Sequence, residues 1–262
     1  MERRLAHPLP DGPEVFMDWQ SLALIALALA GGGLVKGVTG MGMPMVAVPV
    51  VAAFLGVQHA VAVLVVPIVA TNFLQFWAYR SHRRDTEFLP LFLAAGVAGV
   101  GIGTWLLVEL PERALSLGMA AMVAFYITLQ LARPGLRLGA RMAQWLAAPA
   151  GMAAGALQGA TGVSGPVTAM FLHARGLARE SYVFAAAAMF LLFGLVQLPA
   201  LMLAGIMTWR IVLEGTLALL PALVMMSVGG WLARFIKPET FNRIILALLA
   251  VIALQLTAKA LG

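Results

Sequence analysis

The stretch from Gly33 to Pro44 reads G-L-V-K-G-V-T-G-M-G-M-P, and it interrupts an apolar run with glycines, a threonine, a proline and one lysine. The pattern returns 122 positions later, from Gly155 to Pro166, as G-A-L-Q-G-A-T-G-V-S-G-P. Five of the twelve positions are identical, and Lys36 is matched by Gln158, which is also long and polar. Two such breaks, each inside a hydrophobic segment, predict a duplicated membrane protein with its ligand site between the breaks.

The composition of the chain is typical of a protein that lies in a lipid bilayer. Of the 262 residues, 62% are hydrophobic and 11% are charged, whereas soluble domains have about 25% charged residues. Sixteen of the 17 Lys and Arg are scattered through the termini and short loops between apolar runs, which sets membrane orientation and does not indicate nucleic-acid binding. With no cysteine, four scattered histidines and no H-E-x-x-H motif, we expect no disulfide, metal site or cofactor.

The apolar segments predict an all-α polytopic membrane protein built from two inverted repeats. A lead-in occupies residues 1–18, repeat one 19–132, a basic connecting loop 133–141, and repeat two 142–262. Each repeat is expected to hold one re-entrant hairpin and three ordinary spans, which makes about eight transmembrane segments. The expected spans cover residues 59–79, 88–110, 112–131, 181–204, 209–233 and 240–260.

Each break is expected to form the tip of its hairpin. A transmembrane helix needs about 20 residues, and the apolar arms that follow the breaks, 44–55 and 166–173, are too short to cross. The long arms are expected over 19–35 and 142–158. Because each repeat then crosses the membrane an odd number of times, the second repeat is inverted and the two tips should meet near the midplane.

Basic residues in the loops predict the orientation of the chain. One set of loops, which includes Arg80, Arg133 and Arg175, carries eleven Lys and Arg, and the opposite set carries five. The richer side is expected to be cytoplasmic. This orientation places both termini outside, in a multi-pass protein of the inner (plasma) membrane.

The breaks also predict an anion site. Pro44 and Pro166 suit the first turn of a helix, so each tip should present free amides and about half a positive charge. Lys36 is the only Lys or Arg well inside an apolar segment, and a charge there is costly and typically functional. Its alternative role is to neutralise the carbonyl end of its own helix.

The expected substrate-binding residues come from both breaks and from two neighbouring spans. Hydroxyl groups in the breaks can donate hydrogen bonds, and the polar residues of the spans either line the cavity or bond neighbouring helices. The set is Lys36, Thr39, Gly40, Met41, Gly42, Asn72, Gln75, Gln158, Thr161, Gly162, Val163, Ser164 and Gln197. Glu109 and Glu214 lie near span ends and are expected at the interface rather than as proton carriers.

The repeated G-x-x-[KQ]-G-x-T-G-x-x-x-P motif, the small-residue helices around it and the basic central loop resemble the TauE/SafE family of sulfite and organosulfonate exporters. The resemblance covers nearly the whole chain from Trp19 onward. It implies a secondary transporter that exports small sulfur-containing anions, such as sulfite, sulfoacetate or other organosulfonates, by alternating access. It also places the binding site at Lys36, residues 39–42, Gln158 and residues 161–164.

Other functions stay open from the sequence. They are an anion channel, a transporter of another small anion such as a carboxylate or phosphate ester, and a membrane subunit that moves nothing. An inside-negative potential drives an anion outward by about 2.3 kcal/mol per charge per 100 mV, so uniport is the expected mode. The expected partners are the small anion and the lipid bilayer, with a homo-oligomer left open.

Catalysis is not expected, although Gly162-Val163-Ser164-Gly165 matches the G-x-S-G of rhomboid intramembrane proteases. A serine hydrolase needs a base near its serine. The chain from Ser181 onward contains no histidine, and the first break contains no serine. We therefore predict no catalytic residue and no enzyme.

Overall fold

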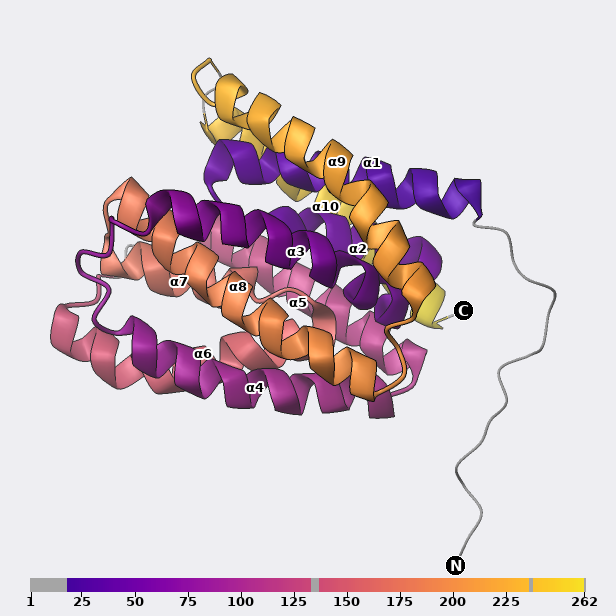
Figure 1. Ribbon diagram of the computed structural model, residues 1–262, viewed down its shortest axis with the longest axis horizontal. Coiled ribbons are helices and arrows are strands. Elements are labelled where there is room, and N and C mark those ends of the chain that lie inside the picture. The colour runs from indigo at the N-terminus through magenta and orange to yellow at the C-terminus, as the bar shows by residue number, and fades with distance from the viewer. Residues whose placement is uncertain (1–17, 133–136, 236–237, 262) are drawn as a thin grey trace, which may run out of the picture.

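The computed structural model describes residues 18–132, 137–235 and 238–261, with the side chains of residues 130, 238–244, 259 and 261 left out (Figure 1). Every regular element in these ranges is an α helix, which confirms the all-α class. The predicted lead-in at residues 1–17, Arg133 and Lys237 lie outside the described residues, as do the side chains of Arg243 and Lys259. The helices are α1 (Trp19–Thr39), α2 (Met43–Leu55), α3 (Val57–Tyr79), α4 (Leu89–Glu109), α5 (Glu112–Ala132), α6 (Ala140–Thr161), α7 (Gly165–Arg175), α8 (Arg179–Leu203), α9 (Trp209–Leu232) and α10 (Pro238–Leu261).

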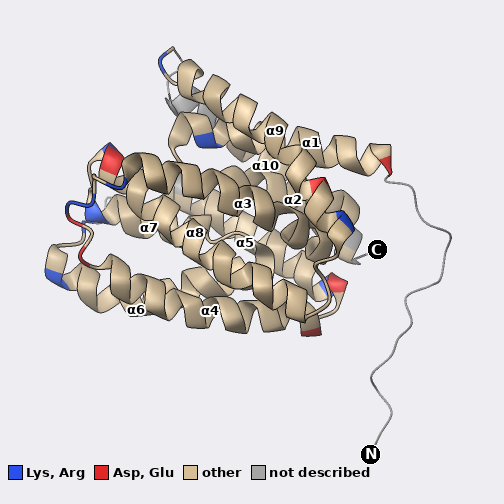
Figure 2. Ribbon diagram, viewed as in Figure 1, with Lys and Arg blue, Asp and Glu red and all other residues tan. Residues whose placement is uncertain are grey.

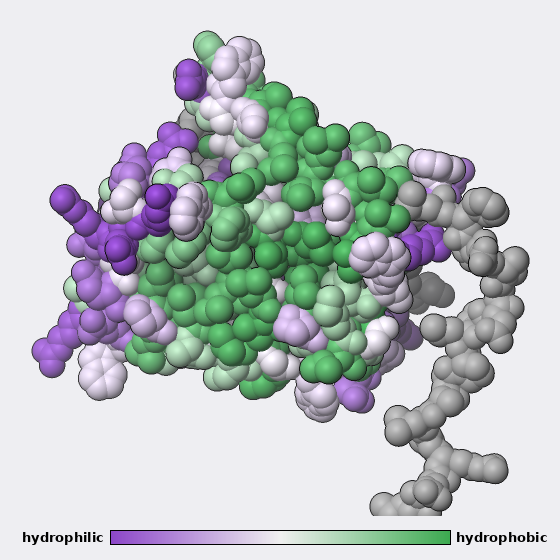
Figure 3. All heavy atoms as spheres, viewed as in Figure 1, coloured by the Kyte–Doolittle hydropathy of each residue, from purple (hydrophilic) through white to green (hydrophobic). Residues whose placement is uncertain are grey.

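Six of the described helices are long and apolar enough to cross a membrane, namely α1, α3, α4, α5, α8 and α9. The apolar helix α2 and the stretch Ile245–Ala258 of α10 are shorter. Charged residues gather towards the two ends of the helices (Figure 2), and an apolar band lies between them (Figure 3). The molecule is therefore a polytopic membrane protein, and the total of about eight segments stays a prediction.

The long arms run further into the breaks than the sequence predicted, to Thr39 and Thr161 in place of residues 35 and 158. Each helix ends at a glycine in the left-handed region, Gly40 (φ 84°) and Gly162 (φ 69°). The earlier glycines of the motif do not end the helix. A Cβ at Gly37 would come within 2.1 Å of a carbonyl oxygen of α9, so this glycine permits close packing.

Both broken helices fold into hairpins. In the first, Gly32 of α1 lies against Ala47 of α2, so that α2 returns along α1. In the second, the outer ends are tied together, because Leu138 donates its N–H to Ala174 at 2.8 Å and Arg175 Nη1 donates to the Leu138 carbonyl at 2.9 Å. The two arms of each hairpin therefore begin and end on the same side of the molecule.

The outer ends of the two hairpins lie at opposite ends of the molecule, which we name end A and end B. End A holds the starts of α1, α3 and α9, where His59 of α3 lies 3.2 Å from Glu214 of α9. End B holds the end of α3 and the start of α8, where the rings of Phe76 and Phe184 stack at 5.4 Å. The first hairpin therefore enters from end A and the second from end B.

The antiparallel pair α3 and α8 forms the centre of the fold, with α1 packed on α9 and α4 packed on α6. Figure 1 shows α1 with α9 on one side and α4 with α6 on the other. Each long hairpin arm thus packs on a helix from the other half of the chain. Glycines allow this, because a Cβ at Gly33 would lie 2.3 Å from the Ala222 carbonyl oxygen and one at Gly155 only 2.0 Å from that of Gly96.

A pair of substitutions in α4 tests the glycine contact with α6. A Cβ at Gly103 would lie 2.1 Å from the Ala156 carbonyl oxygen, whereas one at Gly101 would have no heavy atom within 4 Å. We expect Gly103→Ala to lower the free energy of unfolding by about 1–3 kcal/mol through overpacking. Gly101→Ala should leave it unchanged or raise it slightly. Equal thermal midpoints of the two purified variants in detergent would contradict the packing.

Candidate functional site

The threonines of the two breaks make matching local hydrogen bonds. Thr39 Oγ1 donates to the Val35 carbonyl at 2.9 Å and accepts from Met41 N at 3.4 Å. At the second break, Thr161 Oγ1 donates to the Leu157 carbonyl at 2.8 Å and accepts an N–H of the turn at 3.3 Å. Both hydroxyl groups thus stabilise the turns in this structure, and their assignment to a ligand stays a prediction.

Lys36, Thr71 and Asn72 form a buried group between α1 and α3, here called the lysine cluster. Lys36 is 2% exposed, and its Nζ donates to Asn72 Oδ1 at 2.7 Å and to Thr71 Oγ1 at 3.1 Å. Asn72 Nδ2 in turn donates to the Ile68 carbonyl at 2.7 Å, which fixes the amide with its oxygen towards the lysine. Asn72 therefore joins α3 to α1 through Lys36, and its predicted place in a ligand cavity stays a prediction.

Gln158, Ser164 and Gln197 form the corresponding group between the second break and α8, here called the glutamine cluster. Gln158 Nε2 donates to Gln197 Oε1 at 3.2 Å, and Ser164 Oγ donates to Gln158 Oε1 at 3.1 Å. Gln197 Nε2 donates to the carbonyls of Gln158 and Gly159 at 3.1 and 3.2 Å. All three side chains are buried, so this cluster is uncharged and internally paired.

The tips of the two hairpins contact α3 at different points. On α3, Gly162 of the second tip lies against Val61, whereas Gly40 of the first tip accepts a hydrogen bond from Gln75 Nε2 at 3.2 Å. Those contacts are 14 residues apart, or about 21 Å of helix. The second tip nevertheless lies close to the start of α2, because Gly162 also contacts Val48 and Gly165 contacts Met45. A meeting of the two tips near the midplane stays a prediction.

The two polar clusters nevertheless lie near the middle of the central helix pair. Ile68 is the middle residue of α3, and it packs with Val69 against Gly194 of α8. Asn72 lies one turn from this point towards end B, and Gln197 lies one turn from it towards end A, so each is about 5 Å from the middle. Among the described residues, no hydrogen bond joins the two clusters. The two polar clusters therefore flank the middle of the central helix pair.

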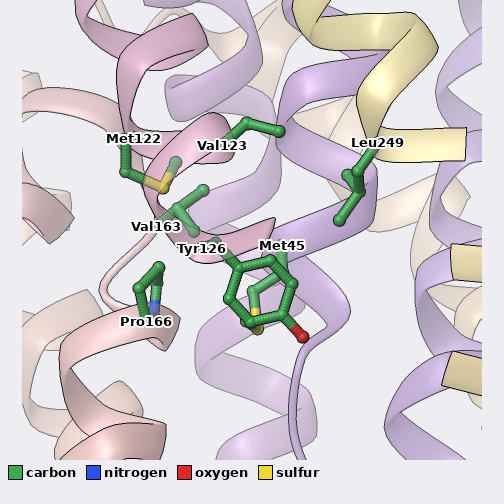
Figure 4. A pocket seen from close by; sticks show the side chains of 7 residues that line it. All are labelled: Met45, Met122, Val123, Tyr126, Val163, Pro166 and Leu249. Carbon is green, nitrogen blue, oxygen red and sulfur yellow. The ribbon is translucent and has the colours of Figure 1, made fainter. Parts of the chain in front are cut away.

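An apolar pocket lies beside the N-terminal turns of α2 and α7 (Figure 4). Of the predicted binding residues, only Val163 lines it. Neither helix has a side-chain hydrogen bond to its first amides, and an uncapped helix start attracts anions. The lining residues are Met45, Met122, Val123, Tyr126, Val163, Pro166 and Leu249.

The comparison with protein families agrees with these features. The family model described as Sulfite exporter TauE/SafE matches residues 24–256, which is nearly the whole chain and includes both breaks and both clusters. The chain belongs to the TauE/SafE sulfite exporter family. No curated protein and no solved structure matches it. Membership makes the protein a membrane transporter of the sulfite-exporter type rather than a member of an enzyme family.

Two polar residues of this TauE/SafE protein were not among the predicted site residues. Thr71 completes the lysine cluster, and the signal for it was its position beside Asn72 in an otherwise apolar span. Glu214 was expected at the interface, but the structure buries it to 2% exposure between α9 and α3. Its side chain points to α3. The sequence shows that Glu214 lies near the end of its span but does not show towards which neighbour its side chain points.

A double substitution tests the lysine cluster. Asn72→Leu should destabilise the TauE/SafE protein by about 1–3 kcal/mol, because the Lys36 ammonium loses its closest acceptor. Adding Lys36→Met removes the donor as well and should restore much of the loss, because replacing both partners by apolar groups is nearly neutral. Thermal unfolding of the single and double variants in detergent measures this coupling. Additive losses would show that the 2.7 Å bond contributes nothing.

Proposed function

We propose that the protein exports small sulfur-containing anions, such as sulfite, sulfoacetate or related organosulfonates, as a secondary transporter. The observation that carries the proposal is the buried Lys36 ammonium beside the middle of the central helix pair. Anion binding at this lysine would be the step that selects the substrate. Alternating exposure of the site to the two sides would move it across the bilayer.

The hydrogen bonding of Lys36 supports an anionic ligand. An ammonium group has three donors, and Lys36 uses two of them on the neutral acceptors Thr71 and Asn72. The ion pairs of the described residues involve Glu214 with His59 and Arg210, and none involves Lys36. A buried charge without an opposite charge is costly. A bound anion would supply the missing charge and accept the third hydrogen bond.

The glutamine cluster gives the proposed site its asymmetry. Gln158 stands where the first repeat has Lys36, and it can donate a hydrogen bond without adding charge. One full positive charge suits an anion that must later be released. The uncapped N-terminal ends of α2 and α7 would add partial positive charge to the proposed site, which would also attract the anion.

Matching contacts support the proposal that residues 19–132 and 142–262 are inverted repeats. Val61 of α3 touches Gly162, and Val183 of α8 touches Gly40. Val183 follows Val61 by 122 positions, and Gly162 follows Gly40 by the same 122 positions that separate the two breaks. Such paired hairpins are the usual basis of alternating access, in which one bundle rocks against the other around a central site.

Lys36→Met should abolish anion binding while leaving the fold intact. Gln158→Met, at the equivalent position of the second break, is the matched control and should weaken binding much less. Binding is measured as the rise in thermal midpoint with sulfite, sulfoacetate, sulfate, phosphate esters and carboxylates, since a ligand of the folded state stabilises it by mass action. Unchanged stabilisation of the Lys36 variant by sulfite or sulfoacetate would leave the lysine with a structural role. Stabilisation of the wild type only by carboxylates or phosphate esters would reassign the substrate.

We also propose that end B is cytoplasmic in the plasma membrane and that both termini are outside. End B carries Arg80, Arg83, Arg84, Arg137 and Arg175, in line with the excess of basic residues in cytoplasmic loops. The chain has no cysteine, so single cysteines report the topology directly. An impermeant maleimide added to intact cells should label Gly205→Cys at end A and leave Ser81→Cys at end B unlabelled. The reverse pattern would invert the orientation.

A further inference from the structure

Among the described residues, two charged side chains are buried, Lys36 and Glu214. The proposed anion site does not use Glu214. It lies between α9 and α3 near end A, with 2% of its side chain exposed. Arg210, one turn earlier in α9, donates its Nε to Glu214 Oε1 at 2.9 Å. The other carboxylate oxygen, Oε2, lies 3.2 Å from Nε2 of His59 on α3.

The two atoms that face each other across this interface are incompletely satisfied. Neither His59 Nε2 nor Glu214 Oε2 has a hydrogen-bond partner with good geometry among the described residues. Buried polar atoms without partners are destabilising. The neutral imidazole can donate from Nε2 to Glu214 Oε2, and a further proton at Nδ1 would make that hydrogen bond charge-assisted.

The charges around this pair leave it free to bind a proton. Arg210 is engaged by the opposite carboxylate oxygen, and Asp18 at the start of α1 interacts electrostatically with Arg210. On α5, Glu112 accepts the first N–H of α3 at 2.8 Å and does not pair with His59. No ion pair reaches His59 from α2 or α8, which also pack on α3, in the described part of the chain. With 30% of its side chain exposed, His59 is accessible at end A.

We propose that His59 and Glu214 form a proton-binding site that opens to end A, and that the bound proton fastens α3 to α9. Protonation of His59 converts a neutral imidazole beside a carboxylate into an ion pair between the two helices. The helix α9 also carries the surface on which α1 packs, and α1 carries Lys36. Proton binding at end A would therefore hold the α1–α9 pair in a fixed position relative to α3. Anion movement should then depend on the pH at end A, which replaces simple uniport with a proton-linked mechanism.

The proton site is tested first without any transport, by NMR of isotope-labelled histidines in the full chain in lipid nanodiscs. The chain has four histidines, and His59→Gln assigns the signal. The His59 signal should shift as the pH is lowered from neutral through the acidic range. Glu214→Gln should displace its midpoint, and Glu214→Asp serves if the first variant does not fold. Glu112→Gln is the matched control, because this carboxylate also contacts α3 at end A, and it should leave the midpoint in place.

A His59 signal that does not change over this range would overturn the proposal. So would a midpoint that is the same in the wild type and in the Glu214 variants. Lys36→Met should leave the titration unchanged, since the lysine cluster lies on the far side of the middle of α3. The proton site and the anion site can therefore fail independently of each other.

The consequence for transport is measured with sulfite as the probe, in proteoliposomes at fixed membrane potential. Changing the pH at end A alone should change sulfite flux through the wild type, and His59→Gln should lose this dependence while sulfite still stabilises it. His82→Gln, in the loop at end B, should keep the dependence. If sulfite flux through the wild type does not change with the pH at end A, the proton-linked mechanism is wrong. A wild type that does not carry sulfite would count against the proposed substrate, and the histidine titration would still decide the proton site.

Discussion

The fold depends on how two helices can be broken inside a bilayer without leaving backbone groups unpaired. Lipid offers no hydrogen bonds, so each break must be satisfied by the protein. The breaks do this in the same way, with a left-handed glycine whose N–H returns to the helix, at Gly40 and Gly162, and a threonine hydroxyl that serves both the helix end and the turn. Glutamines from α3 and α8 supply further donors to the carbonyls nearby. The start of the next helix, α2 or α7, has no side-chain cap, and the proposed ligand would find donors there.

This solution ties the two halves of the chain together. Each tip is closed partly by its own half, through Gln75 or Gln197, and partly by the other half, through Val183 or Val61. The long arms also pack on helices of the opposite half through glycines. The closely packed helix pairs, such as α1–α9 and α4–α6, therefore combine helices from both halves of the chain.

The sequence predicted the features that depend on local pattern and missed those that depend on direction. Hydropathy and the two prolines located the helices and breaks to within a few residues, because lipid selects long apolar runs. The motif glycines at 37 and 159 looked like part of the break, yet they lie inside helices as packing contacts, which only the neighbouring helix defines. The burial of Lys36 followed from its apolar surroundings. The burial of Glu214 did not, because a residue near the end of a span lies either in water or against a neighbour, according to its rotation about the helix axis.

The balance of buried charge explains why only one of the two breaks carries a lysine. Glu214 already has Arg210 as its counter-charge, so the protein retains one uncompensated positive charge near its middle, at Lys36. A carboxylate beside Lys36 would satisfy the ammonium permanently and leave nothing for a ligand to supply. A second lysine in place of Gln158 would put two like charges within a few turns of each other in a medium of low dielectric, where repulsion is strong. It would also hold an anion too tightly to release. In the proposed site, a single ammonium held by two neutral acceptors would avoid both outcomes, because an arriving anion would supply the missing negative charge.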